Sequence, residues 1–264
     1  MVKAGDGAER GERPGRTSVW LEGKAPRTRR SDQPSTLDRE RITVATVKLL
    51  DAEGLAKFSM RRLAAELGVT AMSLYWYVDT KDDLLELALD HVFGELDLPE
   101  PGASEGDWRT QLRQLAGMYR ANLVRHPWTS TLTGHFLNIG PHSLAFSRHV
   151  QRILADTGLT VPGQRGAIAA VFQFVYGYGT IEGHFVQRCA DAGMTQDEYY
   201  HHAMGAFSEL APEMADDYEN ARALMAGTEE HKVEEIREGD FQVALDLLVA
   251  GIDTMVAAQR TTSR

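Results

Sequence analysis

Residues 59–81, with the sequence SMRRLAAELGVTAMSLYWYVDTK, place the strongest constraint on this chain. Apolar residues recur at helical spacing on both sides of Gly68, so the pattern predicts two short helices joined by a tight turn. Ser59 can cap the first helix, over residues 60–67, and the second is expected over residues 70–78. The segment therefore predicts a helix-turn-helix, whose second helix enters the major groove of DNA.

Helical periodicity extends from about residue 38 almost to the end of the chain, with hardly any strand-like alternation, and predicts an all-α protein. Besides those two helices, we expect helices over residues 38–53, 80–96, 108–126, 141–157, 164–190, 195–210 and 240–258. Asp107 is expected to cap the helix at residue 108, and Thr195 with Glu198 forms a capping box. The Pro- and Gly-rich residues 98–106 mark a domain boundary. The predicted parts are a flexible basic arm (1–36), a helix-turn-helix DNA-binding domain with its connecting helix (37–97), and a ligand-binding and dimerisation domain (98–264).

Charge is divided unevenly along the chain, whose formal net charge is −10. Residues 1–37 carry eight basic and five acidic side chains, and residues 38–82 carry seven of each. The remainder carries 13 basic and 26 acidic side chains. An acidic body repels phosphate, so contact with DNA should be confined to the N-terminal third.

Several other classes of protein are disfavoured by simple patterns. The single cysteine, Cys189, excludes a disulfide framework and a cysteine metal cluster, and a buried structural thiol is favoured over a redox sensor. No apolar run of about 20 residues and no secretory signal is present, so we expect a cytoplasmic protein without membrane contact. The histidines lack the spacing of a helical metal motif, so no metal site is predicted. Gly177, Gly179 and Gly183 have the wrong spacing for a dinucleotide loop, so no cofactor is predicted.

The second helix of the predicted motif divides into two faces. Ala71, Leu74 and Val78 share an apolar face that can close a small core, which leaves Met72, Ser73 and Trp76 pointing outward. The alternative is a helical hairpin whose aromatic residues pack against the larger domain. Aromatic donors and an arginine fork suit phosphates and base edges, respectively. We predict DNA contacts from Arg27, Arg29, Arg30, Ser59, Arg61, Ala71, Met72, Ser73, Tyr75, Trp76, Tyr77 and Lys81.

Residues 59–84 resemble the signature of the tetracycline-repressor (TetR) family of bacterial regulators. The matching positions are Ser59, Leu63, Ala64, Leu67, Gly68, Val69, Leu74, Tyr75, Tyr77, Val78, Lys81 and Leu84. The resemblance is specific over residues 38–93, and residues 74–78 are most similar to the branch of the tetracycline repressor itself. It implies an all-helical homodimer with three DNA-binding helices and a ligand-binding domain. It also implies base contacts from Arg61, Ala71, Met72 and Ser73, and phosphate contacts from Tyr75, Trp76 and Lys81.

Two outward positions of the predicted helix 70–78 differ from those of an ordinary DNA-reading helix, and this makes the basic arm a candidate for further DNA contacts. Ala71 and Met72 have no hydrogen-bonding side chains, so direct readout would depend on Arg61, Ser73 and contacts with thymine methyl groups. The arm carries Lys24, Arg27, Arg29 and Arg30, which could enter the minor groove beside the helix-turn-helix. The alternative is a solvated basic tail that adds only non-specific attraction.

Residues 168–187 combine large aromatic residues with three glycines. Small residues four apart allow another helix to approach closely, which suits the subunit interface that the resemblance implies. Aromatic residues on the other face could line a cavity for a planar or polycyclic molecule, and the alternative is an ordinary packed core. The predicted ligand-binding residues are Met118, Tyr119, Asn122, Trp128, Phe136, His149, Phe172 and Tyr176. Near the C-terminus, a seam suited to a helix–helix interface is formed by Phe241, Leu245, Leu248, Ile252 and Met255.

These patterns together predict a ligand-responsive transcriptional regulator, a repressor released from a palindromic operator in double-stranded DNA by a small molecule. Two alternatives remain at this level. The first is a DNA-binding regulator controlled by a protein partner without any small ligand. The second is a helical enzyme, which is disfavoured because the sequence shows no nucleophile–base pair, metal cluster or phosphate loop.

Overall fold

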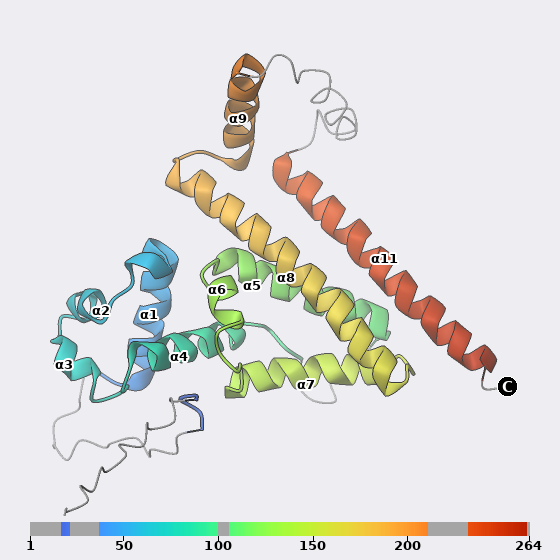
Figure 1. Ribbon diagram of the computed structural model, residues 1–264, viewed down its shortest axis with the longest axis horizontal. Helices are drawn as coiled ribbons and strands as arrows, with labels where there is room; N and C mark the ends of the chain where they lie inside the picture. Colours follow the sequence, from blue (N-terminus) through green and yellow to red (C-terminus); the bar gives the residue numbers. More distant parts are fainter. Residues whose placement is uncertain (1–16, 22–36, 100–105, 211–231, 263–264) are drawn as a thin grey trace, which may run out of the picture.

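A computed structural model describes residues 17–21, 37–99, 106–210 and 232–262 of the 264-residue chain. Its regular secondary structure in these ranges is entirely helical, which confirms the predicted all-α fold (Figure 1). The helices are α1 (Arg39–Glu53), the short 3-10 helix η1 (Leu55–Lys57), α2 (Met60–Glu66), α3 (Ala71–Leu74), α4 (Lys81–Phe93), α5 (Trp108–Arg125), α6 (Thr129–Thr133), α7 (Pro141–Ala155), α8 (Val161–Asp191), α9 (Gln196–Leu210) and α11 (Val233–Thr262). We call residues 37–78 the reader and the described residues from 106 onward the body.

The helices of the reader begin at polar caps. Side-chain oxygens of Asp38, Ser59 and Thr70 accept hydrogen bonds from the backbone N–H groups that open α1, α2 and α3. The turn between α2 and α3 requires Gly68, whose φ of 65° lies in the left-handed region. These local signals explain why the helix starts could be read from the sequence.

The reading helix α3 is shorter than predicted, because it ends at Leu74 rather than at Val78. The N–H groups of Tyr77 and Val78 both donate to the carbonyl of Leu74, at 2.9 and 3.2 Å. Converging on one acceptor turns residues 75–77 into a tight turn instead of extending the α-helical ladder. Leu74 and Val78 are nevertheless buried, as the predicted core requires.

Helix α4 joins the reader to the body. Thr80 and Asp83 form a capping box at its start, and the helix ends at Phe93, three residues earlier than predicted. It packs against α1 on one side and against α6 and α7 on the other. Near its C-terminal end, the Asp90 carboxylate accepts a hydrogen bond of 2.8 Å from the backbone N–H of Ser143, at the start of α7. The position of α4 is therefore set by both halves of the molecule.

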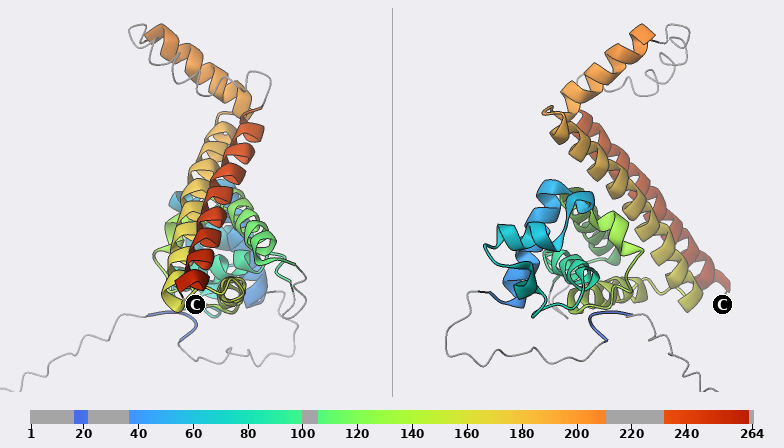
Figure 2. Two further views of the ribbon diagram at one scale, coloured as in Figure 1. Left: turned by 90° about the vertical axis from the view of Figure 1, so that its right-hand side faces the viewer. Right: turned by 60° about the vertical axis from the view of Figure 1, so that its left-hand side comes forward.

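Two long helices, α8 and α11, lie side by side and form the outer layer of the body (Figures 1 and 2). Helix α11 begins at Val233, seven residues before its predicted start, and α6 was not predicted at all. Asp107 occupies the predicted N-cap position of α5, but its carboxylate makes no cap hydrogen bond and accepts from Arg109 instead. The predicted capping box at α9 is confirmed, since Glu198 accepts from the N–H of Thr195 at 2.8 Å.

Two glycines of α8, Gly179 and Gly183, pack against another helix of the same chain. A Cβ atom added at Gly183 would lie 2.9 Å from the carbonyl oxygen of Leu123 on α5, and one at Gly179 would lie 3.0 Å from the Leu123 side chain. The expectation that these two glycines admit a second subunit is therefore corrected. They admit α5 of the same chain, whereas Gly177 has open space where its Cβ would be.

Replacing Gly183 with alanine should lower the free energy of unfolding by about 1–3 kcal/mol, because its methyl group meets rigid backbone. Gly177→Ala is the matched control on the same helix, and it should raise that free energy by about 0.5–1 kcal/mol through helix propensity. Urea unfolding at one protein concentration measures both changes. Equal effects of the two substitutions would contradict the close approach of α5.

Helix α11 has two apolar faces. The face turned toward the rest of the chain buries Phe241, Leu245, Val249 and Ile252, so most of the predicted seam is an interface within the chain. Met255, the last predicted member, is exposed. The opposite side, which we call the free face of α11, exposes Val243, Leu247, Ala250, Gly251 and Thr254. Among the described residues, the segment Val233–Thr261 is the one helix long and apolar enough to span a membrane by length and composition.

Candidate nucleic-acid interface and ligand cavity

The turn after α3 and its neighbours expose large apolar and aromatic side chains. Met72 and Trp76 retain 71% and 59% of their surface, and Tyr75 is also exposed. Ala71 and Ser73 are half-buried, with the Ser73 hydroxyl 2.9 Å from that of Thr70. The reader therefore presents the predicted outward face without covering it with its own side chains. A large exposed apolar cluster on a small helical unit is typical of an interaction site.

The two arginines at the start of α2 have different surroundings. Arg62 donates to Glu53 at 2.6 Å and to Glu66 at 3.2 Å, and these carboxylates raise its pKa. The side chain of Arg62 thus ties α2 to α1. Its neighbour Arg61 is exposed, which agrees with the choice of Arg61 as the candidate for a base contact.

Three other predicted DNA contacts also support the reader internally. The Tyr77 hydroxyl donates to the carbonyl of Leu37 at 2.7 Å, and the Lys81 amine donates to the carbonyl of Phe58 at 3.1 Å. The Ser59 hydroxyl caps α2. A lysine amine carries three donors, so Lys81 keeps two for a phosphate. The predicted contacts Arg27, Arg29 and Arg30, together with Lys24, lie outside the described residues.

A cavity of about 500 Å³ lies between α5, the end of α6, α7 and α8, and we call it the effector cavity. Three of the predicted ligand-binding residues line it, namely Tyr119, Phe172 and Tyr176. The sequence reasoning missed the remaining lining residues, which are Thr133, Gly134, Phe146, Ser147, Val150, Gln151, Ile168, Ala169 and Gln173. Helical spacing from Tyr176 back to Gln173, Phe172 and Ala169 could have identified the α8 members.

The other five predicted ligand-binding residues are not among those that line this cavity. The Asn122 amide donates to the carbonyl of Val92 at 2.8 Å, and the Trp128 indole donates to Asp51 at 2.7 Å. His149 is buried and lies 2.7 Å from the Arg152 guanidinium, which together with burial lowers its pKa. The remaining two, Met118 and Phe136, pack half-buried against the core. Asn122 and Trp128 thus connect the body to α4 and α1.

The effector cavity is lined without a charged side chain. Its aromatic residues form a contiguous cluster. The centroid of the Phe146 ring lies 5.2 Å from that of the Tyr119 ring and 5.7 Å from that of the Phe172 ring. Burial raises the pKa of Tyr119, so its hydroxyl remains protonated and can donate. Amides of Gln151 and Gln173 supply polar groups. Such a lining favours an uncharged, flat, aromatic molecule with a few hydrogen-bonding groups.

A buried histidine, His126, joins the reader to the body. The ring nitrogens of His126, which follows α5, lie 2.7 Å from the Asp51 carboxylate at the end of α1 and 3.0 Å from the Glu95 carboxylate after α4. Because each ring nitrogen faces a carboxylate, the doubly protonated imidazolium fits this site best. Burial by itself lowers the pKa of His126, but the hydrogen bonds to Asp51 and Glu95 outweigh it and raise the pKa above its usual value.

This histidine predicts a pH dependence of stability. A folded-state pKa above the unfolded value means that the stabilisation is complete below about pH 6.5 and is lost as the pH rises through the folded pKa. His126→Gln should therefore cost most at low pH, and its difference from the wild type should shrink as the pH rises. Urea unfolding across a pH series measures this, with the exposed His135→Gln as control. A wild-type advantage that grows with pH would contradict the assignment.

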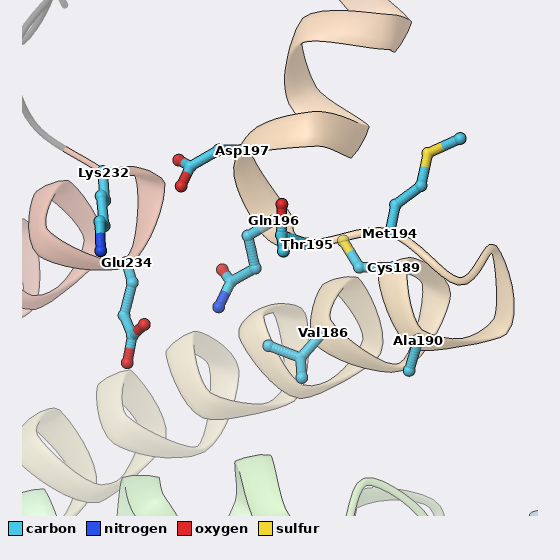
Figure 3. A pocket seen from close by; sticks show the side chains of 9 residues that line it. All are labelled: Val186, Cys189, Ala190, Met194, Thr195, Gln196, Asp197, Lys232 and Glu234. Carbon is cyan, nitrogen blue, oxygen red and sulfur yellow. The ribbon is translucent and has the colours of Figure 1, made fainter.

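A second cavity, of about 380 Å³, lies where the end of α8 meets the starts of α9 and α11 (Figure 3). The Gln196 side chain lies between Cys189 on one side and Lys232 with Glu234 on the other. Burial raises the pKa of the Cys189 thiol, so the thiolate is disfavoured, as expected for a structural cysteine. No cluster of three or more potential metal ligands occurs within the part of the chain that the structure describes.

Comparisons with protein families agree with the resemblance of the reader and extend it to the body. Residues 42–88 match the family model of bacterial regulatory proteins of the tetR family. Residues 98–256 match the model of the tetracyclin repressor-like C-terminal domain. Together the two matches cover both halves of the molecule.

Individual relatives are also similar to this chain. An HTH-type transcriptional regulator of Saccharopolyspora erythraea is 40% identical over 167 residues, which span 63% of this chain and 69% of that protein. The HTH-type transcriptional repressor DrrR1 of Streptomyces coeruleorubidus is 34% identical over 182 residues, or 69% of this chain and 66% of that protein.

Solved structures share the fold. Apo ActR from Streptomyces coelicolor aligns with a TM-score of 0.63 at 24% identity, covering 86% of this chain and all of that one. ActR in complex with actinorhodin aligns with a TM-score of 0.62 at 24% identity, covering 83% of this chain and 96% of that one.

Proposed function

The chain belongs to the TetR family of bacterial regulatory proteins, and from this premise we propose that it is a homodimeric repressor released from a palindromic operator by a small aromatic molecule. Family membership makes it a DNA-binding transcriptional regulator rather than an enzyme, as the sequence predicted. The observation that carries the rest of the proposal is the effector cavity, which lies in the body and is connected to the reader through α4.

For operator binding, α3 and the turn after it enter the major groove. Arg61 supplies the guanidinium that reads a guanine edge, while Met72 and Ala71 contact thymine methyl groups. Tyr75, Trp76 and Lys81 bind phosphates and set the register. The exposure of Met72, Trp76 and Arg61 supports this arrangement. The basic residues of the arm, Arg27, Arg29 and Arg30, add contacts in the neighbouring minor groove.

The proposed effector is uncharged, flat and aromatic, because the cavity is lined by aromatic rings and neutral polar groups. ActR, which shares this fold, has been solved with actinorhodin bound, a precedent for a small molecule in such a protein. A cavity of about 500 Å³ favours this over control by a protein partner alone, which would be better served by a filled core.

Release follows from the position of α4. The effector cavity lies against α5 and α7, and α4 is attached to α7 through Asp90 and to α5 through the Asn122 amide. A ligand that favours a different α5–α7 arrangement moves α4 and changes the spacing of the two α3 helices in a dimer. Only a difference in ligand affinity between the two conformers can shift this equilibrium, so operator and effector must weaken each other's binding.

The subunits are proposed to meet through α8 and α11. The free face of α11 is apolar and is not covered by any described residue, and Ile181 on α8 is also exposed. Small residues on that face, Ala250, Gly251 and Thr254, allow a second helix to approach closely. Burial of this face by a second copy explains an apolar helix on a soluble regulator better than membrane contact does.

The test begins by selecting bound sequences from random double-stranded DNA with the full chain, and we expect an inverted repeat. Arg61→Ala should then weaken binding to the selected duplex by about 1–3 kcal/mol and relax specificity at one base pair of each half-site. Arg148→Ala, an exposed arginine of α7, is the control and should bind as the wild type does.

Planar aromatic compounds are next screened for release of the duplex. Phe172→Ala should weaken the response to a releasing compound without changing operator affinity. If no DNA sequence is enriched in the selection, the proposal that this protein binds a specific operator is refuted. A compound that saturates the cavity but leaves operator affinity unchanged would refute ligand release.

A further inference from the structure

A short segment of the arm, residues 17–21, is docked on the middle of α4, and we call it the anchor segment. The Ser18 hydroxyl and the Val19 N–H donate to the two carboxylate oxygens of Glu86, the latter at 2.8 Å. The segment turns on itself, since the N–H of Trp20 donates to the Ser18 hydroxyl at 3.2 Å. Ser18 is only 4% exposed, so the segment is seated in the surface rather than lying on it.

Glu86 explains why this segment is held. Glu86 is also 4% exposed and lies in the middle of α4, where the neighbouring side chains are mostly apolar. A buried carboxylate is costly unless it accepts hydrogen bonds. In the described parts of the chain, the hydrogen bonds to Glu86 come from the anchor segment. The carboxylate is therefore a specific receptor for a serine followed by a free backbone N–H.

The anchor segment also contacts the reader. The Trp20 ring packs half-buried against the core, and the guanidinium of Arg39, in the first turn of α1, lies 5.9 Å from its centre. At the other end of the arm, Leu37 is buried and its carbonyl accepts from the Tyr77 hydroxyl after α3. The described residues on both sides of the basic side chains Lys24, Arg27, Arg29 and Arg30 therefore contact α4 or the reader.

We propose that Ser18–Trp20 is a docking motif for the Glu86 site of α4, and that this docking couples the DNA contribution of the basic side chains between the anchor segment and Leu37 to the position of α4. The proposal rests on the proposed function and deepens it. Effector binding then acts on two DNA-contacting elements at once, because the helix that displaces α3 also carries the anchor of the arm.

Chain length supports this coupling. The 16 Cα–Cα steps from Leu21 to Leu37 span at most about 55 Å when the chain is fully extended. Without the anchor, these basic residues would be connected to the reader through Leu37 alone. A second attachment through Ser18–Trp20 raises the effective concentration of the arginines at the reader, and with it their contribution to DNA affinity.

Docking itself is tested by hydrogen exchange of the full chain. The Val19 and Trp20 amides should exchange slowly in the wild type and at least about tenfold faster in Glu86→Gln, which loses the charge and one acceptor oxygen. The α4 amides report whether the fold is retained. Equal exchange at Val19 and Trp20 in the two proteins would overturn the Glu86 site.

The link to DNA is tested with a double-mutant cycle on the selected duplex at fixed salt. The variant S18A/W20A should bind about tenfold more weakly, whereas Leu21→Ala, an exposed side chain of the same segment, should bind as the wild type does. The second background replaces Lys24, Arg27, Arg29 and Arg30 by glutamine. There the addition of S18A/W20A should change nothing.

The outcomes separate the two proposals. The role of the anchor would be overturned if S18A/W20A bound the duplex with wild-type affinity. It would also be overturned if S18A/W20A caused the same tenfold loss of affinity in the background with the four glutamine replacements. In either case the proposed function would remain supported if an operator sequence is selected and Arg61→Ala weakens binding to it. If no DNA sequence is enriched, the proposed function fails, while the hydrogen-exchange result still decides whether the anchor docks.

Discussion

Replacing Leu247 with aspartate should convert the protein to a monomer and weaken binding to the selected duplex by at least about a hundredfold. Leu247 lies on the free face of α11 with 71% of its surface exposed. In the proposed dimer this face is buried, so a carboxylate there would lose its hydration without gaining a partner. A monomer offers one α3 helix instead of two, and the loss of the second half-site removes the advantage of bivalent binding.

Sedimentation or light scattering measures the mass, and titration with the duplex measures the affinity. Gln242→Glu is the matched control, because it adds a negative charge at an exposed position of α11 outside the free face. The control should remain dimeric. A dimeric Leu247→Asp protein would show that the subunits associate through another surface, and Val243→Asp then tests the same face one turn earlier.

Replacing Arg120 with methionine should lower the free energy of unfolding by about 3–5 kcal/mol. Arg120 lies in the interior where α5, α8 and α11 meet. Its guanidinium donates to both carboxylate oxygens of Glu182, at 2.6 and 2.7 Å, and also pairs with Glu238. It stacks over the Phe241 ring at 4.4 Å. Without Arg120, the buried Glu182 carboxylate has no cation, and that cost exceeds the worth of an ordinary ion pair.

Arg113→Met is the control for this prediction. Arg113 on α5 pairs with Asp246 on α11 at 2.7 Å, but both side chains are exposed. Removing such a pair should cost at most about 1 kcal/mol. Urea unfolding at a single protein concentration compares the two variants, because the stability of the proposed dimer would depend on protein concentration. Similar small losses in both would mean that water reaches Glu182.

The parts of the fold that were predictable are those specified by local chemistry. Ser59, Gly68 and the Thr195–Glu198 pair act within one turn of the chain, so their roles could be read from spacing alone. Long apolar repeats likewise located α5, α7 and α8. The division of α11 into a buried and a free face could not be predicted, because both faces are apolar and the distinction depends on which neighbours cover them.

The candidate site likewise contains residues whose position follows from local spacing and residues whose role depends on distant parts of the chain. The outward direction of Met72 and Trp76 follows from helical spacing, and the structure exposes both. The use of Asn122 and Trp128 as links to α4 and α1 depends on contacts between residues 30 and 77 positions apart. Spacing within one helix carries no information about such partners. The same limit applies to Glu86, whose buried carboxylate is matched by a serine 68 positions earlier.

The contacts along α4 also indicate where this regulator could be recombined with others as a biosensor. Asp83 and Glu86 bind the start of the helix and the anchor segment, whereas Asp90 binds α7. A chimera joined between Glu86 and Asp90 would keep these contacts on their native sides. The Asp51–His126 contact crosses that junction, so a transplanted reader needs a carboxylate at position 51 to match the histidine of its new body.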